Sequence, residues 1–153
     1  MRTIKFRGKD IETGEWLYGD LFQPLGRFPS IINTEPDING KVAYIQTSVK
    51  KETVGQFTGL LDKNGKEIYE GDILRGDEYP FNSDGVDNYF AEVVWADNVC
   101  GFYRITHKKA NSTVRGISCG NFSELDEEDI KSFEVIGNIH DNPELLEGKN
   151  KKQ

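Results

Sequence analysis

The two histidines and two cysteines are the residues of this sequence whose types best suit catalysis. His107, His140, Cys100 and Cys119 are dispersed along the chain, and none has a base or nucleophile nearby in sequence. The glycines fall in hairpin-like turns, not in a phosphate-binding loop between a strand and a helix. We therefore expect no catalytic residue and no enzyme activity, and we expect both cysteines to be small core residues.

The acidic segment 77–87 is the stretch whose carboxylates could bind a cation. Asp77, Asp84 and Asp87 lie in it, but residues 82–87 lack the alternating ligands and the final glutamate of an EF-hand loop. The sequence therefore predicts no metal site and no cofactor.

Basic residues gather in two segments that contain no acidic residue. Residues 1–9 and 104–123 each carry a charge of +4, and the rest of the chain is strongly acidic. If the two segments meet in space with nearby aromatic rings, they would form a surface suited to single-stranded nucleic acid. The alternative is a solvated sheet edge whose cations prevent aggregation. The residues of this candidate nucleic-acid surface are Arg2, Lys5, Arg7, Lys9, Arg104, Lys108, Lys109 and Arg115.

A run of acids at residues 124–129 is the opposite feature. It could dock on a basic partner protein, because complementary charge speeds association. The alternative is an exposed first turn of a helix, where acids are favourable. The candidate protein-interaction residues are Asp126, Glu127, Glu128 and Asp129.

Composition and charge limit the class of protein. The chain has 153 residues with 36% hydrophobic and 29% charged residues, which is typical of a folded domain and excludes disorder for most of its length. Its net charge of −7 argues against general coating of DNA. No segment is long and apolar enough for a membrane span or a signal peptide, so we expect a cytoplasmic protein.

The pattern of apolar residues predicts an all-β fold. Apolar residues alternate or form short runs, and turn signals recur about every ten residues. Residues 24–40 are rich in proline and glycine, which predicts an irregular excursion with a short strand at 31–32. Ser123 begins a capping-box pattern, which predicts one short helix ending near Ile130, and Pro143 favours a further helical turn.

Four residues are expected to serve the fold. Gly65 suits the positive φ of a tight hairpin after Asp62, and Gly71 permits a reversal in which Asp72 binds neighbouring amides. We expect Trp95 to be buried in a hairpin with residues 102–105, where its removal would cost about 3 to 5 kcal/mol.

Several motifs together resemble the YopX family. They are Ile4-Lys-Phe-Arg-Gly8, Gly14-Glu-Trp16, Tyr18-Gly-Asp20, Gly55-Gln-Phe-Thr-Gly59, the segment 64–73, Phe133-Glu-Val-Ile-Gly-Asn-Ile139 and Asn142-Pro-Glu-Leu145. The resemblance implies an SH3-type barrel core and an origin in phages or prophages, and it implies no established activity or catalytic residue.

These observations predict a single domain over residues 1–147 with a polar tail at 148–153. The barrel core would span about 53–140, with an N-terminal β addition and one or two short helical turns. We expect a non-enzymatic accessory protein that binds an unidentified host or phage protein, with self-association included. The partner surface would be the acidic run, the 77–87 loop or an exposed sheet edge. The alternative function is a nucleic-acid-binding barrel.

Overall fold

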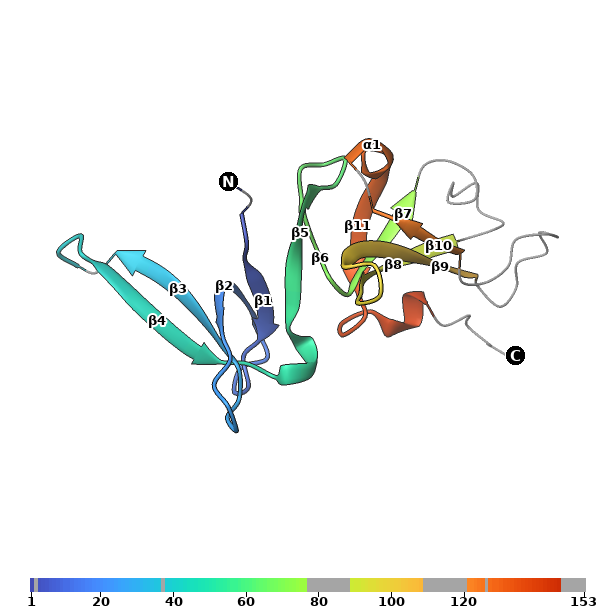
Figure 1. Cartoon of the computed structure of the whole chain (residues 1–153). Coiled ribbons are helices and arrows are strands. Elements are labelled where there is room, and N and C mark those ends of the chain that lie inside the picture. Colours follow the sequence, from blue (N-terminus) through green and yellow to red (C-terminus); the bar gives the residue numbers. More distant parts are fainter. Residues whose placement is uncertain (2, 37, 77–88, 109–120, 126, 147–153) are drawn as a thin grey trace, which may run out of the picture. The chain divides into compact units, whose positions relative to one another are not determined.

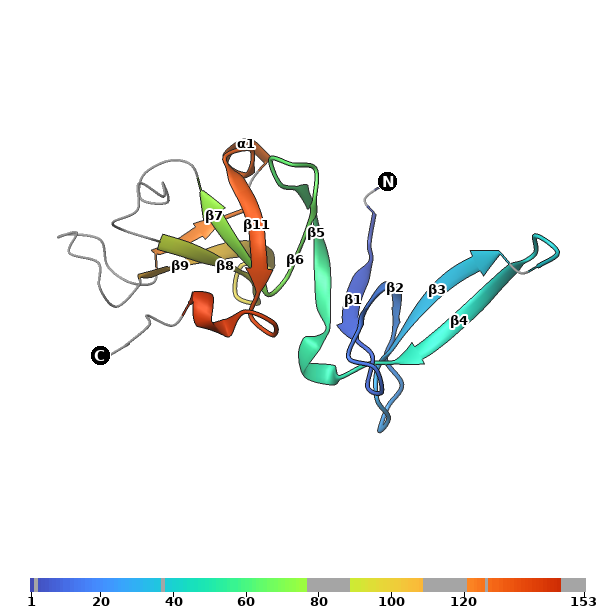
Figure 2. The same cartoon turned by 180° about the vertical axis from the view of Figure 1, so that it is seen from behind.

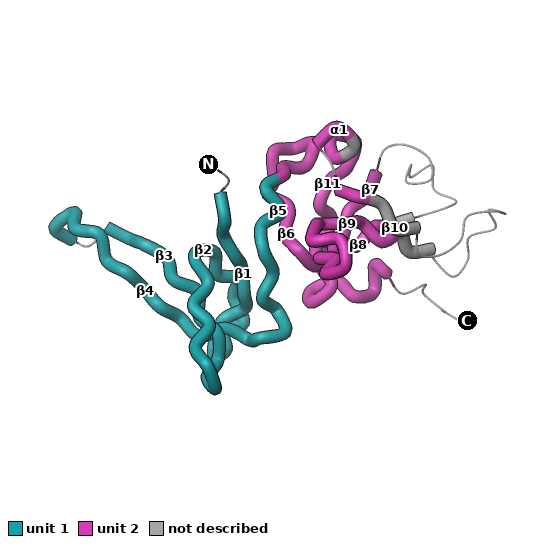
Figure 3. Tube along the Cα trace, viewed as in Figure 1, with its two compact units in different colours: residues 1–59 teal, residues 60–153 magenta. Residues whose placement is uncertain are grey.

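The chain folds into two compact units made mainly of β-strands. A computed structural model describes residues 1, 3–36, 38–76, 89–108, 121–125 and 127–146. Unit 1 comprises residues 1–59 and unit 2 comprises residues 60–153 (Figure 3). The candidate residues Arg2, Asp77, Asp84, Asp87, Lys109, Arg115, Cys119 and Asp126 lie outside the described residues.

Two antiparallel sheets contain all of the described strands. The first has the order β4-β3-β2-β1-β5-β6 and the second β10-β9-β8-β7-β11 (Figures 1 and 2). The strands are β1 (Phe6–Lys9), β2 (Trp16–Phe22), β3 (Ser30–Pro36), β4 (Val42–Ser48), β5 (Gly55–Leu61), β6 (Glu67–Tyr69), β7 (Asp72–Gly76), β8 (Tyr89–Ala96), β9 (Gly101–Lys108), β10 (Asn121–Glu124) and β11 (Phe133–Asn138). The helical turns are η1 (Lys51–Thr53), α1 (Glu127–Ile130) and η2 (Pro143–Leu145).

The mainly β prediction is therefore confirmed, while closure of the SH3-type barrel is not. The described strands pair as two separate sheets, and no pairing among them joins the ends of either into a ring. The two compact units meet at Gly59, inside β5, and the core bounds of about 53–140 stay a prediction. Sequence patterns reveal strands, but closure depends on pairings between distant strands.

In unit 1, the hairpin of β3 and β4 replaces most of the predicted excursion. β3 pairs with β4 over seven consecutive positions, from Ser30 opposite Ser48 to Pro36 opposite Val42. The sequence indicated only residues 31–32 because Asn33, Thr34 and Glu35 have no strong apolar alternation. Pairing with β4 satisfies their backbone groups, so tertiary context extends the strand.

Close backbone approach explains one glycine of unit 1. A Cβ added to Gly19 on β2 would lie 2.1 Å from the carbonyl oxygen of Ile32 on β3. No side chain fits at that distance, so glycine is required for the packing of these two neighbouring strands.

Unit 2 contains the main hydrophobic core. Eight buried residues form one cluster from β6, β7, β8, β9, β11 and the segment around α1: Ile68, Leu74, Ala91, Val93, Phe102, Leu125, Ile130 and Phe133. Leu125 precedes α1 and Ile130 is its last residue, so this single helical turn is held by buried apolar side chains at both of its ends.

Asp62 organises the hairpin between β5 and β6. Its Oδ1 accepts hydrogen bonds from the backbone N–H groups of Asn64 at 2.8 Å and Lys66 at 2.9 Å. Its Oδ2 accepts from Val135 N–H on β11 at 2.9 Å. Gly65 has the expected positive φ of 81°. One carboxylate thus links the turn to a strand 73 residues further along the chain.

The reversal between β6 and β7 has the geometry that the sequence predicts. Gly71 has a φ of 82°, and Asp72 is 1% exposed. Asp72 Oδ2 accepts a hydrogen bond from Tyr69 N–H at 2.8 Å. A buried carboxylate therefore binds a backbone donor at the reversal.

The expected burial of Trp95 is wrong. β8 and β9 form the predicted hairpin and Trp95 lies opposite Phe102, but its side chain is 38% exposed. The two rings meet edge to face at 5.0 Å between centroids, and Trp95 Nε1 donates to Asp97 Oδ1 at 2.9 Å. Because Trp95 lies beside the turn at the end of β8, part of its ring reaches solvent, whereas Val93 on the same face is fully buried.

Two other local expectations are also wrong. Cys100 is exposed in the β8–β9 turn with a φ of 51°, so it is not a core residue. The backbone of Ser123 belongs to β10 and pairs with Arg104 on β9, four residues before α1 begins, so Ser123 does not occupy the predicted N-cap position. Strand pairing uses the backbone of Ser123, so the helix begins only at Glu127. The helical turn expected at Pro143 is present as η2.

Candidate functional site

The residues of the predicted nucleic-acid surface belong to both units. Lys5, Arg7 and Lys9 lie in unit 1, whereas Arg104 and the backbone of Lys108 lie in unit 2. That these residues form one basic face stays a prediction.

The three cations of unit 1 lie on one side of β1 and stack on aromatic rings. Alternate residues of a strand share a face, which places Lys5, Arg7 and Lys9 together. The guanidinium of Arg7 is 4.6 Å from the ring centroid of Trp16, and the ammonium of Lys9 is 5.4 Å from the same ring. The ammonium of Lys5 lies 5.5 Å from the centroid of Phe57. Arg7 is only 5% exposed, so these contacts give its charge a structural role.

The acidic run lies in unit 2 at α1. Glu127 and Glu128 are exposed, and they occupy the first turn of the helix, where acids are favourable. Asp129 belongs to the same turn. The local structure therefore accounts for acids at these positions without a partner.

The strongest surface feature is one that the sequence analysis missed. Among the described residues, eleven large apolar side chains of unit 1 are exposed, and only four apolar side chains are buried, with Pro29 among them. The described part of unit 2 has three exposed and twelve buried. The exposed set in unit 1 is Met1, Ile4, Ile11, Tyr18, Phe22, Leu25, Phe28, Ile38, Val42, Tyr44 and Ile45.

Strand register gathers part of this set on one face of the unit 1 sheet. Residues directly opposite each other in paired strands share a face. Tyr18 is opposite Arg7, Phe22 is opposite Ser30, and Tyr44 is opposite Thr34. We call the side chains of Tyr18, Phe22 and Tyr44 the aromatic face. They are 47%, 46% and 77% exposed, respectively, so the face is open to a partner.

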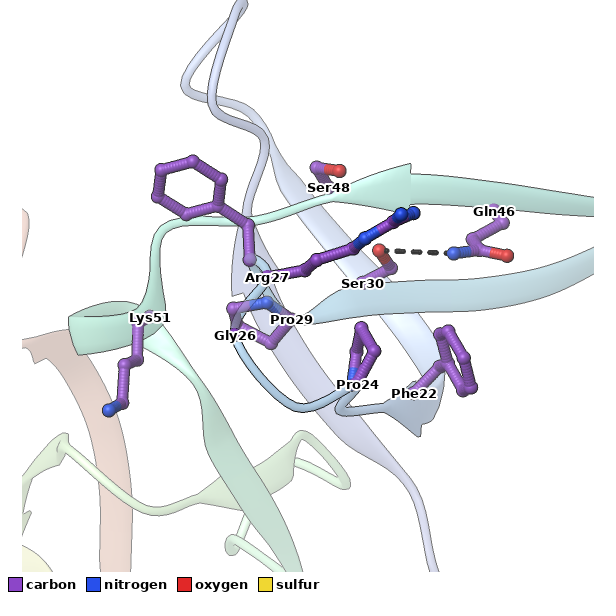
Figure 4. A pocket seen from close by; sticks show the side chains of 10 residues that line it. Phe22, Pro24, Gly26, Arg27, Pro29, Ser30, Gln46, Ser48 and Lys51 are labelled. Atoms are coloured by element: carbon purple, nitrogen blue, oxygen red, sulfur yellow. Dashed lines mark hydrogen bonds between the residues drawn. The ribbon is translucent and has the colours of Figure 1, made fainter.

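An open groove of about 710 Å³ lies on the same face, under the loop between β2 and β3. Its lining combines rings with two cations and three polar side chains: Phe22, Pro24, Gly26, Arg27, Phe28, Pro29, Ser30, Gln46, Ser48 and Lys51. The side chain of Arg27 extends across Ser30 toward Gln46, and Lys51 lies on η1 (Figure 4). Gln46 Nε2 donates to Ser30 Oγ at 3.3 Å, which fixes the floor of the groove. Of the residues that the structure describes, no acidic one lines the groove.

Sequence signals for this groove exist but are ambiguous. The segment 22–30 contains two phenylalanines, two prolines and an arginine, a composition that is typical of both turns and binding loops. Its relation to Gln46 and Lys51 depends on the β3–β4 pairing, which the sequence did not reveal.

Among the described residues, no group of three or more His, Cys, Asp or Glu side chains could hold a metal ion. The helices of the described segments are too short and polar to cross a membrane. The fold and its surfaces thus define a small β-sheet protein with exposed apolar side chains in its N-terminal unit.

The chain belongs to the YopX family, because the family model described as YopX protein matches residues 5–147. Its structure is similar to that of protein EF1440 from Enterococcus faecalis, with 26% sequence identity and a TM-score of 0.56. The match covers 95% of this chain and 99% of that protein. No curated protein matches the sequence.

Proposed function

We propose that this chain is a non-enzymatic protein-interaction module, encoded by a phage or prophage and acting in the cytoplasm of the bacterial host. The observation that carries the proposal is the excess of exposed apolar side chains in unit 1. Contiguous apolar surface on a folded protein commonly marks a site of protein association. The proposed binding surface is therefore the aromatic face and its groove, rather than the acidic run at α1.

The groove indicates the chemistry of the partner. Phe22 and Phe28 offer apolar rings, which are enriched in the centres of protein interfaces. Arg27 and Lys51 add positive charge, and the described lining contains no acid to offset it. A partner segment with apolar side chains and at least one carboxylate would complement both features.

Charge distribution favours a protein partner over nucleic acid. Residues 1–59 hold eight basic and seven acidic residues, a net charge of +1, and residues 60–153 carry −8. Nucleic-acid binding needs several cations that are accessible to phosphates. Arg7, central to the predicted basic surface, is buried over Trp16.

Affinity capture with matched variants tests the proposal. The intact chain and two double variants would be used as bait in lysate from induced bacterial cells. One variant alters the groove and the other alters the acidic run at α1. We expect Phe22→Ser/Phe28→Ser to lose the proteins that the intact chain captures. Glu127→Lys/Glu128→Lys is the control and should retain them. Equal capture by the intact chain and the phenylalanine variant would contradict the proposal.

A titration separates the nucleic-acid alternative. Fluorescence anisotropy of labelled single-stranded and duplex DNA and RNA would be measured at two salt concentrations. Phosphate contacts release counterions, so true binding weakens steeply as salt rises. Salt-sensitive binding that Lys5→Ala/Lys9→Ala abolishes would favour the nucleic-acid function instead.

A further inference from the structure

The edge strand β4 lacks the features that usually protect a sheet edge from pairing. Natural edge strands are short, charged, bulged or covered. The other described strands at sheet ends follow this rule: β6 and β10 are short, and β6, β10 and β11 each contain a glutamate. β11 also has a register shift between Val135 and Gly137. β4 has seven residues, no charge, and a continuous register with β3.

Hydrogen bonding shows which backbone groups of β4 point away from β3. Val49 N–H donates to the carbonyl of Pro29 at 2.8 Å, so the odd-numbered residues of this strand direct their backbone groups toward β3. The even-numbered residues point outward. The carbonyl of Ser48 does so and accepts from Ile11 N–H at 3.2 Å, which covers that end of the strand. Within the segments that the structure describes, no backbone hydrogen bond reaches the outward N–H and C=O groups of Val42, Tyr44 and Gln46.

This edge is complementary to itself. In an antiparallel pair about a two-fold axis beside Tyr44, each Tyr44 faces its symmetry mate and each Val42 faces Gln46 of the other copy. All three pairs are then hydrogen-bonded positions, and the pairing brings no like charges together. Val42 and Tyr44, now 63% and 77% exposed, would gain cross-strand neighbours.

We propose that β4 pairs antiparallel with β4 of a second copy of this chain, in the register that places the two Tyr44 residues opposite each other. The inference rests on the proposed interaction function and names one partner for it. We assign a second copy as the partner of this edge because β4 is uncharged and can pair with itself about a two-fold axis. The groove with Arg27 and Lys51 instead favours a charged partner.

Sedimentation equilibrium and directed cross-linking test the pairing. We expect the intact chain to form dimers as its concentration rises. Tyr44→Lys sets two cations face to face and should shift the chain to monomer, and at concentrations where the intact chain is also monomeric the two should share an unfolding midpoint. Gln46→Lys adds the same charge opposite Val42 and should leave most of the dimer. A monomeric intact chain at every concentration would overturn the proposal.

Cysteine cross-linking tests the register in a Cys100→Ser/Cys119→Ser background. Tyr44→Cys should give a covalent dimer on mild oxidation, because directly opposed hydrogen-bonded residues lie about 5.5 Å apart, within disulfide reach. Gln46→Cys should not, because its copies would be separated by four residues along the strand. Equal cross-linking of both would overturn the register. The two proposals can fail separately. If the intact chain is monomeric but captures proteins that Phe22→Ser/Phe28→Ser does not capture, self-pairing is refuted and the interaction function stands.

Discussion

Replacing Asp62 with asparagine tests how one carboxylate holds unit 2 together. The oxygen of an asparagine can keep the bonds from Asn64 and Lys66, but its amide then turns a donor toward Val135 N–H. The change removes one charge-assisted hydrogen bond and leaves a partly buried donor facing another donor. We expect a loss of about 2 to 3 kcal/mol in the free energy of unfolding. For a chain of this size the melting temperature should fall by about 4 to 12 °C.

The pH dependence of this loss identifies its origin. Burial raises the pKa of Asp62, but hydrogen bonds from the N–H groups of Val135, Lys66 and Asn64 outweigh it and lower the pKa below the ordinary value of 3.8. A carboxyl whose pKa is lower in the folded state stabilises the fold above its unfolded pKa. That contribution is lost as the pH falls through the folded value. The effect of Asp62→Asn should therefore be full at pH well above 3.8 and shrink below it.

Denaturant titrations at neutral and acid pH would measure both quantities. Asp97→Asn is the matched control, because Asp97 is exposed and an asparagine oxygen can still accept from Trp95 Nε1. We expect that variant to unfold within about 0.5 kcal/mol of the intact chain. If Asp62→Asn behaves like Asp97→Asn at neutral pH, the assignment of Asp62 as the link between hairpin and β11 is refuted.

Three further substitutions have expected outcomes. Gly19→Ala should destabilise unit 1 by about 1 to 3 kcal/mol, because its Cβ would lie 2.1 Å from Ile32 O; thermal melts that match the intact chain would contradict the close approach. Gly65→Val should cost about 1 to 3 kcal/mol in chemical denaturation, because a β-branched residue is strained at a φ of 81°, and Gly65→Asn should cost less. Trp95→Ala should cost less than the 3 to 5 kcal/mol typical of a buried ring, about 1 to 2 kcal/mol for a half-exposed aromatic pair with Phe102, and a larger loss in urea unfolding would show that Trp95 is buried in solution.

Local chemistry explains which predictions from the sequence were accurate. The turn at Gly65 and the reversal at Gly71 depend on residues only a few positions apart, and both have the expected backbone geometry. The helical turn at Pro143 is equally local. The sequence also predicted the family correctly, because the family motifs lie in fixed order along most of the chain.

Predictions that depended on distant neighbours were less accurate. The burial of Trp95 depends on its place at the end of β8, and the role of Ser123 depends on whether β9 takes its backbone as a strand partner. Neither neighbour can be read from the surrounding residues. The carboxylate of Asp62 likewise reaches Val135, which no local pattern indicates.

The amino-acid sequence by itself determined the mainly β class, the turns and the family, because these follow from side-chain alternation and backbone preferences over short spans. Only the tertiary structure decided which surface is open. Whether Tyr44 or Phe22 is buried depends on the strands and loops packed around it, and in unit 1 too few elements cover the sheet to enclose them. Exposure is a property of the whole packed arrangement, so the candidate binding face and the open edge of β4 could be found only there.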